Sequence, residues 1–171
     1  MSQDKPKAKY FTVNEANSLL PVLNEIFDEL DDRKRSLLKI YEQVQIIEAM
    51  WGDKITSITN PDHNSYSKHI SSAKDLSKNL NEFVSREILG RGLRFPPGGL
   101  DQGLIDFPTT FEDRWIFMCW ERGEPQVNFW HEITAGYAGR QDIQAEHIIT
   151  MGKHQNMGGA EFDFRTTLSL L

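Results

Sequence analysis

The chain has 171 residues, a formal net charge of −6, and 39% hydrophobic and 26% charged residues. This composition is typical of a water-soluble globular protein and excludes a disordered or collagen-like chain. No basic region predicts nucleic-acid binding, and the longest uncharged apolar run, Trp115 to Trp120, is too short to cross a membrane.

A long helix is predicted to begin at Thr12. Thr12 and Glu15 have the spacing of a capping box, in which each side chain accepts a hydrogen bond from the other residue's backbone amide. Apolar residues then recur at alternating intervals of three and four as far as Trp51, the pattern of a coiled-coil-like helix. Pro21 interrupts this pattern, so we expect a kink or a short first helix ending near Leu20, with the main helix running from Pro21 to about Trp51.

A second helix is expected at about residues 66–89, where apolar residues form one stripe and Gly90 and Gly92 provide the end. Turn-forming residues at 53–65 separate the two helices, which therefore pair as an antiparallel hairpin. The predicted seam buries Leu23, Leu30, Leu37, Val44 and Trp51, with Ile47 replacing Glu48. Further apolar residues of the first helix lie outside this seam and predict a contact with the C-terminal part or with a second subunit in a homodimer: Leu19, Ile26, Leu38, Ile40, Ile46, Ile47 and Met50.

From residue 91 the sequence changes to turns and short apolar runs. Runs at 104–107, 114–120 and 126–131 predict a small antiparallel sheet. Residues 121–125 suit a five-residue loop that places Trp120 opposite Gln126. Because the run from Trp115 to Trp120 is apolar on both faces, we expect both faces to be covered, one of them by a helix.

The predicted fold class is α+β. A long antiparallel helical hairpin occupies residues 1–90, and a small antiparallel β-sheet module at 91–143 packs on the helices. Residues 144–171 show no sustained period and are expected to form a loosely ordered tail, with room for one strand or short helix at 161–168.

Five segments in this order carry a resemblance to a known family: Glu15–Pro21, Gly103–Pro108, Cys119–Pro125, Trp130–His131 and Ala135–Gln141. On these motifs, residues 9–143 resemble the prokaryotic family called domain of unknown function 2203. The resemblance implies a helical N-terminal half ahead of the strands, and it implies no substrate, cofactor or catalytic residue. The turn at 96–99 and the tail after Ile143 depart from the family.

Cys119 and His131 are the residue types of a thiolate–imidazole pair. In the five-residue register Cys119 faces Val127 and His131 faces Trp115, which separates the pair by four residues, or about 13 Å, along the strands. A register shifted by one residue turns the two side chains to opposite faces. We therefore expect no catalytic pair and interpret Cys119 as a buried structural residue.

Motifs for metal or enzymatic chemistry are not found in the sequence. The histidines lack the spacing of a zinc-protease helix, and the least improbable metal ligands are Asp106, Glu124 and His131. We expect neither a metal nor a cofactor. Walker, Rossmann and nucleophile-elbow motifs do not occur either, which favours a non-enzymatic protein without excluding an enzyme.

The segment from Gly136 to Arg140 is the best candidate for ligand binding. Gly136 and Gly139 let backbone amides approach a ligand, and Arg140 offers a planar fork for a carboxylate or phosphate. The other candidates are Asp106, Glu124 and His131, with Trp120 and Trp130 for stacking on a flat ligand from one sheet face, about 13 Å apart. In the alternative interpretation, Arg140 pairs with Asp106 or Glu124 and pins the hairpin to the helices, and the tryptophans pack on the helices.

Two functional hypotheses follow. The leading one is a non-enzymatic cytoplasmic protein that self-associates as a homodimer or holds a protein partner. The alternative is a protein that binds a small anionic ligand, or a weak enzyme, with a polar pocket between the sheet and the helices. The polar N-terminal residues favour the cytoplasm, and neither hypothesis involves nucleic acid or a membrane.

Overall fold

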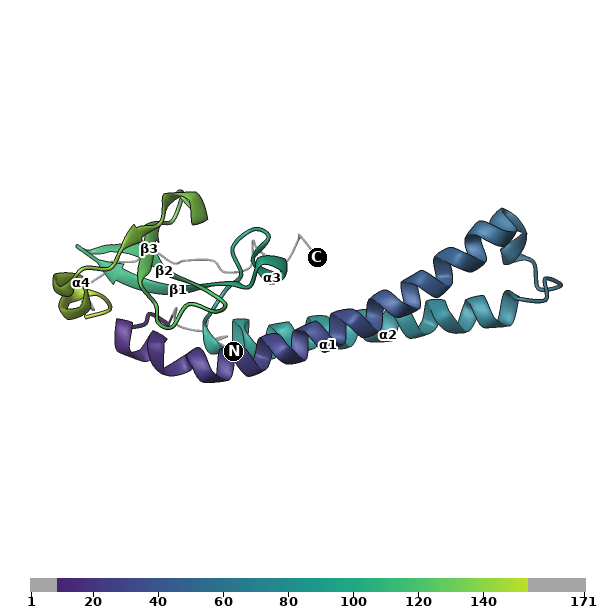
Figure 1. Ribbon diagram of the computed structural model, residues 1–171, viewed down its shortest axis with the longest axis horizontal. Helices are drawn as coiled ribbons and strands as arrows, with labels where there is room; N and C mark the ends of the chain where they lie inside the picture. The colour runs from purple at the N-terminus through teal and green to yellow at the C-terminus, as the bar shows by residue number, and fades with distance from the viewer. Residues whose placement is uncertain (1–8, 154–171) are drawn as a thin grey trace, which may run out of the picture. The chain divides into compact units, whose positions relative to one another are not determined.

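The computed structural model describes residues 9–153 (Figure 1). Within them the chain divides into two compact units. The sheet unit comprises residues 9–24 and 88–153, and the hairpin unit comprises residues 25–87. Helix α1 (Val13–Trp51) belongs to both, so its first turns group with the strands, although we expected them in the hairpin. None of the described helices is long and apolar enough to cross a membrane.

Helix α1 begins at the predicted capping box. Thr12 Oγ1 accepts a hydrogen bond from the Glu15 amide at 3.2 Å, and Glu15 Oε2 accepts one from the Thr12 amide at 2.8 Å. A helix end near Leu20 does not occur, because α1 continues through Pro21. A proline inside a helix costs about 3 kcal/mol, and burial of Leu20 and Leu23 on both sides of it offsets this cost.

The hairpin unit pairs the later part of α1 with α2 (His63–Glu87), and η1 (Gly52–Thr56) begins the connection. Near this connection, Tyr66 donates a hydrogen bond to Glu48 Oε1 at 2.8 Å. Farther away, the Arg33 guanidinium lies 4.5 Å from the centroid of the Phe83 ring. These contacts confirm the antiparallel hairpin, and Ile47 is buried beside exposed Glu48, as predicted.

The predicted seam is buried only in part. Leu23, Leu30 and Val44 are buried, whereas Leu37 and Trp51 are half-buried, contrary to our expectation. Two paired helices cover each other on one side only, so seam residues along the hairpin stay partly accessible to solvent.

The sheet unit contains a four-stranded antiparallel sheet in the order β1-β2-β3-β4, which confirms the α+β class. The strands are β1 (Leu104–Phe111), β2 (Arg114–Glu121), β3 (Phe129–Glu132) and β4 (Gln141–Asp142). The short helices are η2 (Leu89–Arg91), α3 (Gly99–Gln102), η3 (Tyr137–Gly139) and α4 (Ala145–Thr150). Between β1 and β2, Glu112 and Asp113 both have positive φ angles, 49° and 57°, which suits a two-residue hairpin turn.

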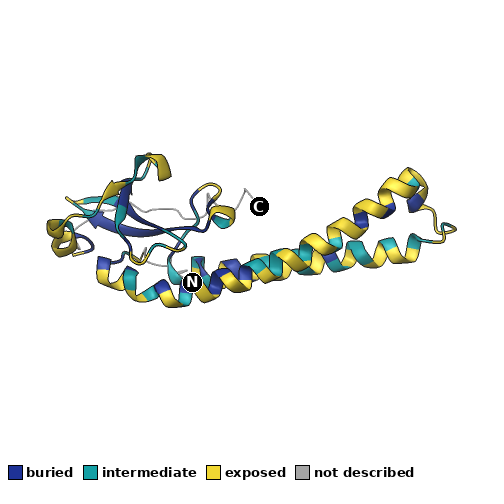
Figure 2. Ribbon diagram, in the orientation of Figure 1, coloured by how far each residue is buried: buried dark blue, intermediate teal, exposed yellow. Residues whose placement is uncertain are grey.

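Both faces of β2 are buried, as predicted (Figure 2). On one face, the rings of Phe11 and Phe107 are in edge contact with centroids 5.7 Å apart. Asn17 on α1 accepts a hydrogen bond from the Val127 amide at 2.8 Å, so the first turns of α1 pack against the strands. The second face carries the polar residues of the candidate site.

The register of β2 against β3 differs from the prediction. Cys119 lies opposite Phe129, not Val127. The connection extends over residues 122–128 because Glu124 folds back onto the end of β2, where its carboxylate accepts a hydrogen bond from the Glu121 amide at 2.8 Å. This shift of two residues keeps each side chain on its predicted face but moves it along the strand.

The first part of the predicted tail is ordered. After α4, Met151 is fully buried and the Gly152 amide donates to the Thr110 carbonyl at 3.0 Å. A Cβ at Gly152, whose φ is 74°, would lie 2.6 Å from the Phe11 carbonyl oxygen, so only glycine fits. A helix of 6 residues leaves no period in the sequence, which is why we did not predict it. The strand or helix expected at 161–168 lies outside the described residues.

Candidate functional site

The candidate site lies on the second face of the sheet, where three buried ionisable side chains meet. Asp106 on β1 lies opposite Cys119 on β2, and His131 on β3 lies opposite Phe117, two residues from Cys119. All three residues are 0% exposed, and one ligand atom from each lies within 4.8 Å of the others. We call these three residues the Asp-Cys-His cluster.

The predicted separation of Cys119 and His131 is wrong. In the observed register they lie two residues apart along the strands, not four, and on the same face. The five-residue loop that we assumed was too short, so the prediction placed His131 too far from Cys119. The expectation that Cys119 is buried is confirmed.

Arg94 holds one oxygen of the Asp106 carboxylate. Its Nε and Nη2 donate to Oδ2 at 3.1 and 2.9 Å, and the two residues also exchange backbone hydrogen bonds. The guanidinium lies 3.7 Å from the centroid of the Phe117 ring. We did not predict Arg94, because it forms an isolated bridge outside the named strands. Its contacts leave Oδ1 of Asp106 to the other members of the cluster.

The hydrogen bonds of His131 fix where its ring carries hydrogen. Nδ1 lies 2.8 Å from the Glu132 carbonyl oxygen, and a carbonyl only accepts, so Nδ1 carries a hydrogen. Nε2 lies 3.2 Å from Oδ1 of Asp106. Two acceptors at this distance need a proton between them, so Nε2 and Oδ1 share one.

Burial and hydrogen bonding act on the pKa values of the cluster. Burial lowers the pKa of His131, but the hydrogen bonds to Asp106 and to the Glu132 carbonyl outweigh it, so the pKa is raised. Burial raises the pKa of the Cys119 thiol, and the nearby Asp106 charge raises it further. The thiol is therefore protonated at neutral pH and is a poor nucleophile in this state.

Arg140 forms one of the two predicted pairs. Its Nη2 donates to both Glu124 carboxylate oxygens at 2.8 Å and to the Cys119 carbonyl oxygen at 3.2 Å, and its side chain is 11% exposed. The other predicted partner, Asp106, pairs with Arg94 instead. An anion that approaches Arg140 has to compete with the Glu124 carboxylate.

The turn from Gly136 to Arg140 uses backbone amides internally. The Gly139 amide donates to the Gly136 carbonyl at 3.1 Å, and the Arg140 amide donates to the Tyr137 carbonyl at 3.2 Å. The Tyr137 hydroxyl donates to Glu121 at 2.9 Å, which ties the turn to the end of β2. These contacts tie the turn to β2 and to the loop after it, not to a helix as the pinning interpretation expected, and ligand binding by Gly136 and Gly139 stays a prediction.

Trp120 and Trp130 share one face of the sheet but lie closer than predicted. Trp130 is opposite Met118, two residues from Trp120. Trp120 is fully buried and donates its indole N–H to the Glu124 carbonyl at 3.0 Å. Trp130 is 6% exposed and packs against the Phe111 ring with centroids 5.7 Å apart. This burial favours packing over stacking on a ligand.

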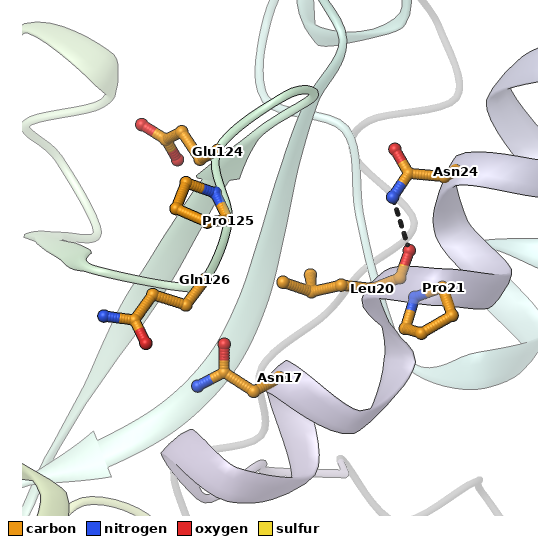
Figure 3. A pocket seen from close by; sticks show the side chains of 7 residues that line it. All are labelled: Asn17, Leu20, Pro21, Asn24, Glu124, Pro125 and Gln126. Atoms are coloured by element: carbon orange, nitrogen blue, oxygen red, sulfur yellow. Dashed lines mark hydrogen bonds between the residues drawn. The ribbon is translucent and has the colours of Figure 1, made fainter.

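A surface pocket of about 520 Å³ lies in the sheet unit beside the start of α1 (Figure 3). It is lined by Asn17, Leu20, Pro21, Asn24, Glu124, Pro125 and Gln126. Among the described residues that line the pocket, Glu124 is the only one that we predicted as a ligand residue. The other polar lining side chains are neutral amides. The lining therefore offers no cation to attract an anionic ligand.

Comparison with known proteins gives a family match. The family described as "Uncharacterized conserved protein (DUF2203)" matches residues 9–143, the range over which the motifs carry their resemblance. This range includes the Asp-Cys-His cluster, Arg94 and Arg140. No curated protein and no solved structure matches the chain.

Proposed function

The chain belongs to the DUF2203 family, whose description assigns no activity, and we propose that it is a self-associating protein whose homodimer forms through α1. One observation carries this proposal. Leu38, Ile46 and Met50 are 60%, 53% and 62% exposed, and we call them the apolar stripe. Large apolar side chains grouped on an exposed face mark interaction surfaces.

The apolar stripe lies on the side of α1 that α2 does not cover. At 100° per residue, Leu38, Ile46 and Met50 fall within about 120° of the helix circumference. The centre of this arc is opposite Val44, which is buried in the hairpin. The hairpin alone therefore leaves the stripe in solvent.

A second copy of this chain is the partner that best complements the stripe. In a two-fold, coiled-coil-like antiparallel pairing centred near residue 44, Leu38 of one copy faces Met50 of the other. Self-pairing thus covers the stripe.

The proposal places the dimer in the cytoplasm of a prokaryotic cell and assigns it no catalysis. A single cysteine suits a reducing compartment.

Light scattering after size-exclusion chromatography tests the proposal. Wild type should have twice the 19.7 kDa chain mass, and Ile46→Glu should return to the single-chain mass, because a carboxylate at the stripe cannot be desolvated without cost. Asn79→Glu on exposed α2 is the matched control and should stay dimeric. A wild type with the single-chain mass at all concentrations would disprove the dimer.

Binding of a small anionic ligand is the second candidate, and it has weaker support. Its specific observation is the largely buried Arg140 guanidinium, but Glu124 already neutralises that charge. Thermal unfolding of wild type and Arg140→Ala, each with and without phosphate, separates the two roles.

A further inference from the structure

We propose that Asp106, Cys119 and His131 bind a divalent transition-metal ion of the zinc class. The three side chains offer one oxygen, one sulfur and one nitrogen, all within 4.8 Å of one another and fully buried. Zinc binds carboxylate oxygen, thiolate and imidazole together, normally with tetrahedral geometry. Three protein ligands leave one position of such an ion for one small non-protein ligand.

Outer contacts already orient two of the three ligands. Arg94 holds Oδ2 of Asp106, which leaves Oδ1 as the ligand atom. The Glu132 carbonyl accepts the Nδ1 hydrogen of His131, which leaves the lone pair of Nε2 directed at Oδ1. Metal-binding histidines and carboxylates are normally fixed by contacts of this kind, because they set the tautomer and the ring orientation.

The charge of the buried cluster is the same with a metal ion as with protons. Without metal, one proton lies between Nε2 of His131 and Oδ1 of Asp106, which are 3.2 Å apart, and the fully buried Cys119 carries its thiol hydrogen. A divalent ion replaces both: the S–H bond breaks, the metal–sulfur bond forms, and the two protons leave to solvent. Exchange of two single charges for one double charge adds no net charge to a site from which water is excluded.

Cobalt(II) is the probe, because it occupies zinc sites and absorbs visible light. The full chain is unfolded in denaturant with a chelator that removes bound metal, and the chelator is then removed. The chain is refolded with Co²⁺, so that burial of the cluster does not limit access of the ion. We expect about one Co²⁺ per chain, the visible bands of a tetrahedral ion, and a thiolate-to-cobalt charge-transfer band in the near ultraviolet. Cys119→Ala should lose the charge-transfer band, and His131→Gln should bind more than about tenfold more weakly. His69→Gln, on α2, is the matched histidine control and should bind as wild type.

Two results would overturn the site. One is uptake below about a tenth of an equivalent by wild type, both after refolding with Co²⁺ and after expression in zinc-rich medium. The other is a charge-transfer band that persists in Cys119→Ala. If that variant does not fold, proton release from wild type decides, because both protons should appear in solution for each ion bound, and release of none would overturn the proposal.

Discussion

The two units depart in opposite directions from the usual distribution of polar and apolar residues. The sheet unit buries Asp106 and His131 completely, whereas the hairpin unit leaves Leu38, Ile46 and Met50 more than half exposed. In an isolated chain the first feature costs desolvation free energy and the second leaves apolar surface in water. Our two proposals reduce these departures with different partners: a metal ion inside the sheet unit, and a second copy of the chain on the hairpin unit. Mutations in the two units should therefore have different consequences.

The largest expected effect is loss of Asp106. Asp106→Ala leaves the Arg94 guanidinium, which is 16% exposed, without its carboxylate, and removes the acceptor for His131. Removal of one partner from a buried ion pair costs about 3–5 kcal/mol. The free energy of unfolding by denaturant, measured with a chelator present, reports this loss without a contribution from bound metal.

The matched control is Asp142→Ala, at an exposed carboxylate on β4 of the same sheet. It should change the free energy of unfolding by less than about 0.5 kcal/mol. Equal effects of the two substitutions would show that the buried ion pair does not stabilise the sheet unit.

Within the hairpin unit, Leu30 and Leu37 form a matched pair of seam positions. Leu30 is 0% exposed, so Leu30→Ala should cost about 2–5 kcal/mol. Leu37 is only half-buried and Leu37→Ala should cost about 1 kcal/mol, because part of its side chain stays in water in the folded state too. Thermal unfolding of both variants measures the difference. Equal destabilisation would mean that Leu37, which lies on the Val44 side of α1 and not on the apolar stripe, is fully covered in solution.

A smaller effect is expected at Arg140. Arg140→Ala leaves Glu124, which is 20% exposed, without its charged donor and should cost about 1–3 kcal/mol. Addition of millimolar phosphate should not change the thermal midpoint of either protein, since Glu124 occupies the guanidinium in wild type. Phosphate stabilisation of wild type that disappears in Arg140→Ala would support the anion site instead.

The hairpin could be predicted from sequence because its determinants are local. The capping box at Thr12 and the intervals of three and four along α1 need no knowledge of distant residues. The choice between a kink and a helix end at Pro21 could not be made from the sequence, since it depends on burial of neighbouring residues by the folded chain. The same reason explains the half-burial of Leu37, which depends on how much surface α2 covers.

The Asp-Cys-His cluster could be predicted only in part. Asp106 and His131 were candidates individually, but their contact depends on the register of three strands. That register follows from how Glu124 folds onto Glu121, and an error of two residues moves a side chain by about 7 Å along a strand. Arg94 had no sequence signal, because a single bridge outside a strand has neither a period nor a motif.

The smallest expected effect is at the capping box, whose carboxylate is exposed. It shows how little a charge contributes when it is not buried as Asp106 is. Hydrogen bonds from the amide and hydroxyl of Thr12 lower the pKa of Glu15. An unfolded glutamate has a pKa of about 4.3, so the ionised Glu15 stabilises the fold above that pH, and this contribution is lost as the pH falls through the lower folded value. Glu15→Gln keeps the capping atoms without the charge, and because solvent screens that charge, wild type should be more stable by only about 0.3 kcal/mol at neutral pH. Thermal midpoints of the two proteins should converge in acid. A difference between the two proteins that persists in acid would mean that it comes from hydrogen-bond geometry and not from charge. A stability difference at neutral pH as large as that for Asp106→Ala would contradict the view that the charges of the sheet unit matter because they are buried.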